Sequence, residues 1–369
     1  MVALCITLGL VYVAASSVIA LSNHAQSSLA ETSSARANAD TRVVLDAYVS
    51  GYLAKDSALR HWNLRSQEVT CVAVETTDTY CSATYQVHRV HTLNCPSAAE
   101  WPAVKGRLKY MQDHGRGLNE EHRVALQRDV DMWVKEISSY IAEPQDCYDT
   151  LQVIGLNGPG PAIDPSTIRV YGQGPEGEFI GISLGQIPSP ADVERAAYEG
   201  TAELLAGIKA TGVAPLALYN RLAARDYANR YTSSPLTYMC GTNPNPGCIQ
   251  DTRKYNTAYA YICCNDCANF VSQSVAAGGI LPDTVWKPGN SEWNFVPNLV
   301  TYMTVTNNYW QVTTLGNCVA GYPIVPTPTH IVLMVYNDGI TRKYSAHTND
   351  RLQANWYNPP EPVCYRVIY

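Results

Sequence analysis

The sequence predicts an α+β fold that combines antiparallel strands with helices. Residues 68–93 and 330–347 each contain two β-prone runs joined by a short polar turn, which is typical of a hairpin. Residues 119–143 repeat apolar side chains at helical spacing. A chain of 369 residues, 46% of them hydrophobic, is long enough for two domains with substantial cores.

The first forty residues precede the predicted fold. Residues 1–20 are apolar, and the first charged residue of the chain is Glu31. They predict a secretory signal peptide or an uncleaved anchor, although the basic segment that normally opens a signal is missing. A wrongly assigned start codon fits either reading. Residues 21–40 are rich in serine, alanine and asparagine without periodicity, which predicts a disordered linker. We therefore expect a secreted protein or an extracellular domain on a membrane anchor.

Charge and cysteine content agree with this location. The net charge is −6 and no basic run occurs, so a nucleic-acid partner is not expected. Removal of Cys5 with the signal leaves eleven of the twelve cysteines, a density typical of an oxidising compartment. Because eleven is odd, the sequence predicts one free and reactive thiol. It does not indicate an oligomeric state.

Residues 41–156 form a predicted N-terminal helix and hairpin domain whose fold and role the sequence leaves open. Residues 41–59 have apolar side chains along one side of a helix. In the following hairpin, Cys71 and Cys81 lie on opposite arms at similar distances from the turn. A cross-strand disulfide between them is therefore expected.

The clearest helix of this first domain lies between Asn119 and Pro144. Asn119 can cap it, Glu120 and Glu121 favour its first turn, and the proline ends it. One apolar stripe predicts its buried face: Leu126, Val130, Trp133, Val134, Ile137 and Ile141.

Residues 157–215 connect this domain to a second one, residues 216–369. The connection contains Gly/Pro-rich stretches and a helix that has Pro190 in its first turn and is followed by Gly212. Its segment "GQGPEG" lacks the lysine and the following helix of a phosphate-binding loop.

The stretch "CCNDCANFVSQ" carries the candidate nucleophile. Asn265 or Asp266 can cap a helix that ends at Gly278 and Gly279, which puts Cys267 in the first turn. Free backbone N–H groups and the positive end of the helix dipole lower a thiol pKa at such a position. We therefore predict an activated thiol at Cys267.

The hairpin "THIVLMVYNDGITRKYSAHTND" supplies two histidines. With Asp338 and Gly339 as a two-residue loop, His330 pairs with His347 on the same face of the hairpin. A nucleophilic cysteine needs a base held by a second group. This pairing predicts His330 as the base and His347 as its orienting partner, with Asn349 and Asp350 as alternatives to His347.

Four blocks in order, "YNRLAARDYANRY", "NDCANFVSQSVAAGG", "THIVLMV" and "SAHTNDR", resemble the bacterial putative amidase domain family. That family is grouped with the papain-like NlpC-type and CHAP-type cysteine hydrolases. The resemblance covers residues 216–369 and implies a compact domain in which the cysteine-bearing helix packs on an antiparallel sheet. It implies that Cys267 is the nucleophile, His330 the base and His347 the third polar group, with no cofactor or metal.

The implied reaction is hydrolysis of an amide or peptide bond through an acyl-thioester. Secreted relatives of this fold commonly cut cell-wall peptides, so peptidoglycan is the first substrate expected. No block marks the oxyanion hole, for which the N–H of Cys267 is a physical candidate, together with a side chain from residues 259–261.

Two alternatives use the same residues. In the first, a structural zinc ion has a Cys2His2 ligand set: Cys264, Cys267, His330 and His347. In the second, the domain is an inactive binding or structural module in which Cys263, Cys264 and Cys267 all form disulfides. The segment between Cys240 and Cys248 reads as a disulfide-tied surface loop or as a lid.

Overall fold

The computed structural model describes six stretches of the chain: residues 41–157, 163–206, 219–233, 254–262, 264–357 and 362–368. The predicted signal and linker, Cys263 and the loop between Cys240 and Cys248 lie outside them. None of the helices in these stretches is long and apolar enough to cross a membrane.

By its internal contacts the chain divides into two compact units, and neither is continuous in sequence. Unit 1 comprises Met1–Tyr52, Ala73–Ala83 and Val153–Arg169. Unit 2 contains the remaining residues: Leu53–Val72, Thr84–Gln152 and Val170–Tyr369. Every predicted site residue belongs to unit 2.

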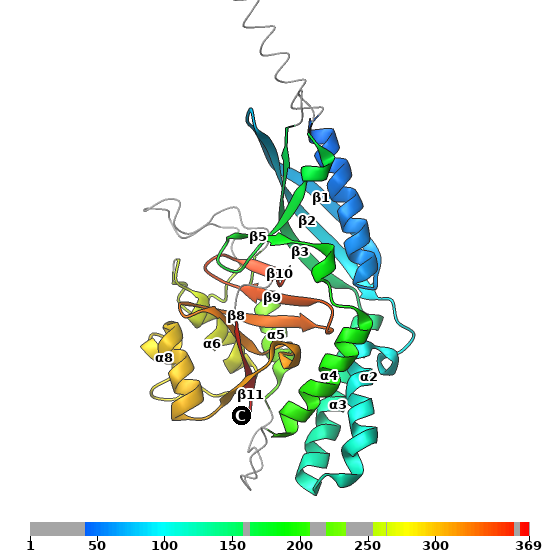
Figure 1. Cartoon of the computed structure of the whole chain (residues 1–369). Coiled ribbons are helices and arrows are strands. Elements are labelled where there is room, and N and C mark those ends of the chain that lie inside the picture. The colour runs from blue at the N-terminus through cyan, green and yellow to red at the C-terminus, as the bar shows by residue number, and fades with distance from the viewer. Residues whose placement is uncertain are drawn as a thin grey trace, which may run out of the picture. The chain divides into compact units, whose positions relative to one another are not determined.

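The fold is α+β with two sheets, as predicted (Figure 1). The first sheet has the strand order β1-β2-β3-β4-β5. Its strands are β1 (Trp62–Thr76), β2 (Tyr80–Leu93), β3 (Gln145–Leu156), β4 (Arg169–Gln173) and β5 (Phe179–Ile182). The strands β1 and β2 form the predicted hairpin of residues 68–93, and β4 and β5 are antiparallel.

The second sheet lies entirely in unit 2 and has the order β10-β9-β8-β7-β11-β6. Every neighbouring pair in it is antiparallel. Its strands are β6 (Trp310–Thr313), β7 (Pro323–Thr327), β8 (His330–Asn337), β9 (Arg342–Ala346), β10 (Arg351–Asn355) and β11 (Val363–Val367).

The helices fall into three groups by contact. In unit 2, α2 (Pro102–His114), α3 (Glu120–Ala142) and α4 (Pro190–Ala206) pack together. The helices α5 (Arg221–Arg230) and α6 (Cys267–Ala277) pack on each other and on β8 and β9. The third group consists of the short helices α7 (Ser291–Asn294) and α8 (Val296–Thr301), which follow α6 in the chain. Separately from these groups, residues 41–59 form the predicted first helix.

The predicted helix boundaries of α3 are confirmed by its contacts. The side chain of Asn119 accepts a hydrogen bond from the N–H of His122 at 2.8 Å, which is a standard N-cap. Four residues of the predicted stripe are fully buried: Leu126, Val130, Trp133 and Ile137. Local sequence signals were sufficient here because both the cap and the stripe act within one helix.

The helices α2 and α4 approach each other closely at Gly106. A Cβ atom built there would lie 2.1 Å from the backbone oxygen of Glu194 and 2.8 Å from the Cβ of Ala197. Only glycine allows this separation of the two helices, so the close approach depends on the missing side chain.

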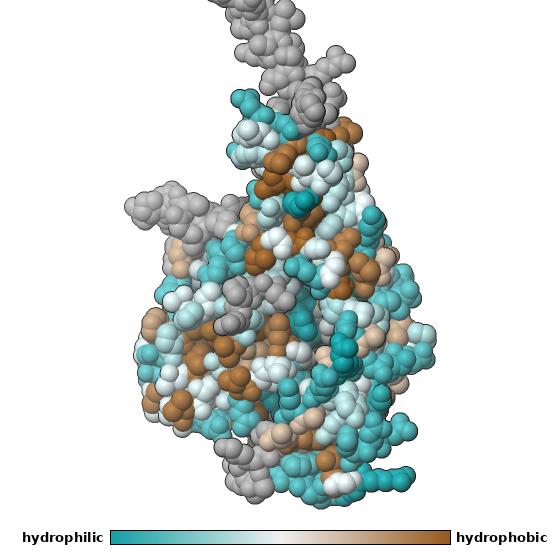
Figure 2. All heavy atoms as spheres, in the orientation of Figure 1, coloured by the Kyte–Doolittle hydropathy of each residue, from teal (hydrophilic) through white to brown (hydrophobic). Residues whose placement is uncertain are grey.

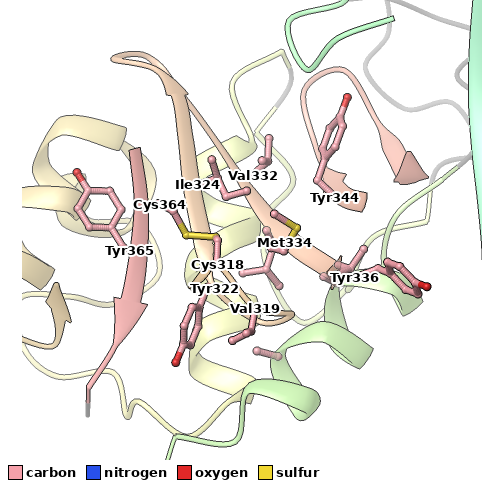
Figure 3. Packing of buried hydrophobic residues seen from close by; sticks show 14 of the residues in the cluster. Cys318, Val319, Tyr322, Ile324, Val332, Met334, Tyr336, Tyr344, Cys364 and Tyr365 are labelled. Atoms are coloured by element: carbon pink, nitrogen blue, oxygen red, sulfur yellow. A yellow bond between two sulfur atoms is a disulfide. The ribbon is translucent and has the colours of Figure 1, made fainter. Parts of the chain in front are cut away.

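The core of the second sheet contains apolar side chains from β7 and β8 and a disulfide between Cys318 and Cys364 (Figure 3). The disulfide ties the segment before β7 to β11, which is the neighbour of β7 in the sheet. At the surface, Figure 2 shows hydrophobic side chains in several separate places on the visible face.

Lys343 on β9 is a buried cation in this core. Its ammonium group donates hydrogen bonds to the backbone oxygen of Asp146 at 2.6 Å and to Nε2 of His91 at 2.8 Å. Burial lowers the pKa of Lys343 to about 8, and burial also holds the pKa of His91 far below its ordinary value. Both partners of this lysine come from the part of unit 2 that precedes residue 157.

The cysteine predictions need two corrections. Cys81 has a free thiol, so the expected disulfide with Cys71 does not form. The sulfur of Cys81 instead lies 3.4 Å from the hydroxyl of Thr76, which is five residues nearer the turn than Cys71. The expectation of a single free thiol is also wrong, because Cys95 and Cys147 are free as well.

Candidate active site

Cys267 is the first residue of α6, as predicted, and only 2% of it is exposed. It has a free thiol, whereas Cys264 is in a disulfide. Cys267 is therefore not silenced by a disulfide with its neighbours. A disulfide also makes Cys264 unavailable as a thiolate ligand, which contradicts the Cys2His2 zinc site. Within the described stretches, no group of three or more His, Cys, Asp or Glu side chains is placed to hold a metal.

The thiol of Cys267 lies against the start of β8. Its S–H donates to the backbone oxygen of Thr329 at 3.8 Å. Burial raises the pKa of Cys267 above its ordinary value, and hydrogen bonds from the backbone of Ile331 and Ala268 and from Thr348 only partly offset this shift. The predicted lowering is therefore wrong, because desolvation of the thiolate outweighs the favourable position at the helix start.

Asp266 occupies the N-cap position of α6, but its carboxylate does not cap the helix. One oxygen, Oδ1, accepts hydrogen bonds from the N–H of Ile262 at 2.9 Å and from the side chain of Asn269 at 2.7 Å. The other, Oδ2, lies 2.6 Å from Nδ1 of His347. The residue directly before the candidate nucleophile is thus held by a histidine 81 positions later in the chain.

Both ring nitrogens of His347 are engaged. Nε2 donates to the backbone oxygen of Tyr231 at 2.6 Å, and the ring stacks on Phe270 with the centroids 4.1 Å apart. Burial alone would lower the pKa of His347, but the hydrogen bond to Asp266 and the charges of Asp350 and Asp266 outweigh it and raise the pKa. An imidazole that donates from both nitrogens is protonated.

The register of the β8–β9 hairpin differs from the predicted one. The structure pairs Leu333 with Ser345 and closes the turn between Asn337 and Arg342, with a bulge in between. The turn therefore contains the four residues 338–341 instead of two. The carboxylate of Asp338 stabilises it by accepting hydrogen bonds from the N–H groups of Ile340 and Thr341 at 2.8 and 2.6 Å.

This register separates the two histidines. Extended from the pair Leu333–Ser345, it places His347 opposite Ile331 and not opposite His330. Because neighbouring residues of a strand point to opposite faces, His330 and Ile331 do not share a face. The predicted His330–His347 pair is therefore wrong, and His347 holds Asp266 instead.

His330 is 97% buried at the start of β8, and its Nε2 atom has no hydrogen-bond partner in the described stretches. Burial lowers the pKa of His330; the charge of Glu176 opposes this shift, and the charge of Arg351 adds to it. The side chain is consequently neutral at neutral pH. Its backbone is flanked by Thr329 and Ile331, two of the residues that contact the Cys267 thiol.

Glu176 is a site residue that the sequence did not reveal. It lies between β4 and β5 in the "GQGPEG" segment, and its carboxylate accepts a hydrogen bond from the hydroxyl of Thr327 at 2.7 Å. Thr327 on β7 pairs with His330 on β8. The backbone oxygen of Glu176 also accepts a hydrogen bond from Asn349 at 3.0 Å, so Asn349 is held by this segment. Nothing in the sequence distinguishes Glu176 from other surface carboxylates.

The structure thus brings Cys267, Asp266 and His347 together and places His330 next to the thiol through the backbone. Among the described residues, no hydrogen bond joins the sulfur of Cys267 to either imidazole. Tyr261, within the segment expected to assist an oxyanion, has its ring centroid 5.9 Å from that of His347.

Residues 218–317 match the family described as "Putative amidase domain". The matched range contains Cys267 and α6 but ends before His330 and His347. None of the curated proteins and none of the solved structures matches the chain. The family match supports a hydrolase of the amidase type at a coarse level.

Proposed function

From this match and the surroundings of Cys267 we propose that the chain is a papain-like cysteine hydrolase that cleaves amide or peptide bonds. The observation that carries the proposal is a free thiol at the first residue of α6, held against the backbone on both sides of His330. A thiol at a helix start next to a histidine is the arrangement used for nucleophilic catalysis by cysteine.

His330, and not His347, is the proposed base. A base must be neutral before it accepts a proton, and burial keeps His330 neutral. His347 is held protonated by Asp266 and Tyr231 and has no free nitrogen. Hydrogen bonds between catalytic groups are often long without substrate, and the proposal requires the His330 ring to turn toward the sulfur when substrate binds.

In the proposed reaction, His330 takes the proton of the Cys267 thiol, and the sulfur attacks the carbonyl carbon. The oxyanion is stabilised by the N–H of Cys267, which as a first-turn N–H has no partner within the helix. His330 then gives its proton to the leaving amine as the C–N bond breaks. Water, deprotonated by His330, hydrolyses the thioester and restores the thiol. Asp266 and His347 position the start of α6 and take no proton.

The proposed substrates are short peptides and amides outside the cytosol, with cell-wall peptides as the first class to test. The disulfide between Cys318 and Cys364 and the disulfide at Cys264 support this location, because disulfides persist in oxidising compartments.

The test is hydrolysis of a panel of peptide amides and peptidoglycan peptides by the purified chain. Cys267→Ala is expected to abolish turnover, and His330→Gln to lower kcat/KM by a factor on the order of 10²–10⁴. Cys147→Ala, at another buried free thiol, serves as the matched control and should retain activity. An acid-quenched reaction should show the acyl group on Cys267 by mass spectrometry. Turnover that survives Cys267→Ala would reject the mechanism.

A further inference from the structure

A cavity of about 190 Å³ lies in unit 2, and Cys267 is not among the residues of its wall. Its walls come from β1 to β4 and from β10 and the residue preceding it, and they include Glu68, Gln86, Tyr148, Gln173 and Arg351. A cavity of 150 Å³ in another protein holds a benzene molecule, so this one has room for a ligand the size of one amino acid.

Arg351 is the first residue of β10, and only 7% of it is exposed. Its Nη1 atom donates to the backbone oxygen of Asp350 at 2.9 Å. In the described part of the chain, the buried atoms Nε and Nη2 have no partner in good hydrogen-bond geometry, and the guanidinium interacts with the single hydroxyl oxygen of Tyr344. Buried donors of a charged group are costly to leave unsatisfied, so this arrangement calls for an acceptor.

The relative positions of the two unsatisfied donor atoms indicate which kind of acceptor fits them. Nε–H and one N–H of Nη2 lie on the same edge of the planar guanidinium and point in parallel. Two parallel donors match the two oxygens of a carboxylate in a bidentate pair. A single carbonyl or hydroxyl oxygen would satisfy only one of them.

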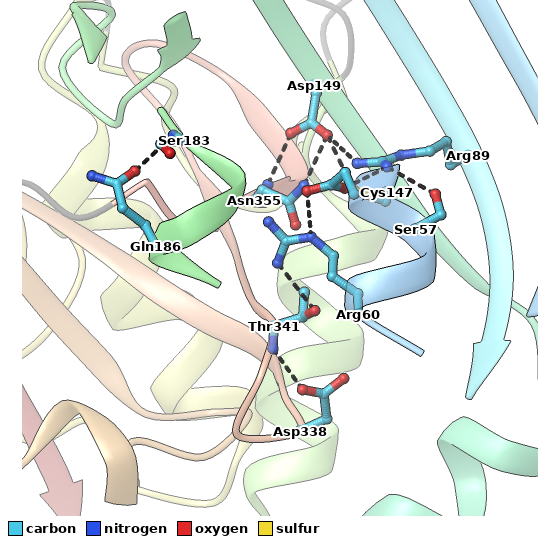
Figure 4. A network of polar contacts seen from close by, with 11 residues as sticks. Ser57, Arg60, Arg89, Cys147, Asp149, Ser183, Gln186, Asp338, Thr341 and Asn355 are labelled. Atoms are coloured by element: carbon cyan, nitrogen blue, oxygen red, sulfur yellow. Dashed lines mark hydrogen bonds and ion pairs between the residues drawn. The ribbon is translucent and has the colours of Figure 1, made fainter. Parts of the chain in front are cut away.

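The cavity wall contains the carboxylates of Glu68, Asp149 and Asp350, and none of them is hydrogen-bonded to Nε or Nη2 of Arg351. That of Asp149 is already committed. Asp149 accepts hydrogen bonds from Arg89 at 3.0 Å and from the side chain of Asn355 at 2.9 Å (Figure 4). Arg89 is also paired with Asp56 at 2.7 Å, so this network is balanced within the fold. Asp149 therefore supports the wall without supplying the missing acceptor.

The backbone beside Arg351 is irregular. The pairing of β10 with β9 shifts register between Arg351 and Ala354, and Gln353 has a φ of +47°, which is unfavourable for a residue other than glycine. Bulges of this kind re-aim side chains and are frequent next to functional sites. The strained backbone is thus a second observation at the same cavity.

We propose that this cavity binds the carboxylate group of a small ligand through Nε and Nη2 of Arg351. The ligand class is an N-acylated amino acid or the C-terminal residue of a short peptide. The hydroxyl of Tyr148 and the amide of Gln86 in the wall would provide donors and acceptors for the rest of the ligand. Binding at this site does not involve the thiol of Cys267, so the binding proposal can be tested separately from the proposed hydrolysis.

The experiment compares two probes that differ only in the group facing Arg351: N-acetylalanine and its carboxamide. Binding is measured by calorimetry and by thermal shift on the full chain carrying Cys267→Ala, so that turnover cannot interfere. We expect saturable binding of the acid and at least ten-fold weaker binding of the amide. N-acetylglutamic acid α-amide carries its only carboxylate on the side chain. It tests whether Arg351 binds an α-carboxylate or a side-chain carboxylate.

Two arginine variants test the residue. Arg351→Gln should weaken binding of the acid at least ten-fold, and Arg351→Lys, which keeps the charge but loses the planar pair of donors, should give an intermediate loss. Arg128→Gln on the exposed side of α3 is the matched control and should bind normally. Equal binding of acid and amide to the intact guanidinium overturns the proposal even if the Arg351 variants do not fold. Full binding by a folded Arg351→Gln protein overturns it as well.

Discussion

The imidazole of His347 lies 2.6 Å from the carboxylate of Asp266, and Asp266 directly precedes Cys267. Both side chains are nearly completely buried. This ion pair connects the end of the β8–β9 hairpin to the start of α6. The position of the candidate nucleophile therefore depends on a buried pair of opposite charges.

Loss of either partner should destabilise the fold strongly. Asp266→Asn or His347→Gln leaves the other group buried without its counter-charge, which typically costs about 3–5 kcal/mol. The double variant should lose less than the sum of the two, because the residues are in contact. Urea denaturation measures all three. Arg195→Gln, in an exposed ion pair on α4, should leave the midpoint unchanged. Additive losses would mean that the two residues are not coupled.

The same pair predicts how stability depends on pH. The pKa of His347 in the folded chain is raised above its ordinary value of 6.5, so its contribution is fully present below pH 6.5. That contribution is lost as the pH rises through the folded pKa. The unfolding free energy should therefore fall above pH 6.5 more steeply in the wild type than in His347→Gln. Buried His330 and His91 act with the opposite sign, but their effects are common to both proteins and cancel in the comparison.

Alkylation should distinguish a buried thiol from an activated thiolate. Because burial raises the pKa of Cys267 above its ordinary value, its reaction with iodoacetamide should be slow at pH 6 and should increase with pH into a more alkaline range than for an exposed cysteine. Peptide mapping by mass spectrometry gives the rate at each cysteine, with the urea-unfolded chain as the reference. Rapid and selective labelling of Cys267 at pH 6 would contradict the raised pKa.

The close contact between α2 and α4 predicts opposite effects for two glycine substitutions. Gly106→Ala introduces a methyl group 2.1 Å from the backbone oxygen of Glu194 and should destabilise by about 1–3 kcal/mol. Gly51→Ala, in the helix of residues 41–59, meets nothing within 4 Å and should stabilise by about 0.5–1 kcal/mol. Thermal denaturation followed by circular dichroism measures both. A stabilising Gly106→Ala would show that the two helices separate freely.

The helices and hairpins were predictable because their signals are local. Asn119 and Pro144 bound α3, and the first turn of α6 begins at Cys267 as the pattern indicated. The register of the β8–β9 hairpin was not predictable from the Asp338–Gly339 dipeptide. The Asp338 side chain binds two backbone N–H groups in a turn of four residues, which moves the partners next to the turn by two positions. The bulge between Met334 and Tyr336 takes one position back, so beyond it each residue is paired one position away from its predicted partner, which lies on the other face.

The electrostatics of the site could not be predicted from the helix position of Cys267 alone. The degree of burial decides the direction in which its pKa shifts, and burial depends on contacts such as that with Thr329, directly before β8 and 62 residues away in the chain. Glu176 reaches the surroundings of His330 from a separate sheet, and Arg351 from a bulged strand. Contacts between residues so far apart in the chain cannot be predicted from the spacing of residues in the sequence.

The buried ammonium group of Lys343 decides where this chain can be divided. A fragment that begins at residue 216 contains all the blocks that resemble the amidase family, but it lacks Asp146 and His91. Lys343 on β9, the second strand of the six-stranded sheet, would then lose both hydrogen-bond partners of its ammonium group, and the face that these residues cover would be open. Family boundaries therefore do not indicate a fragment suitable for expression, and any shortened form intended for crystallisation or enzymology has to begin upstream of His91.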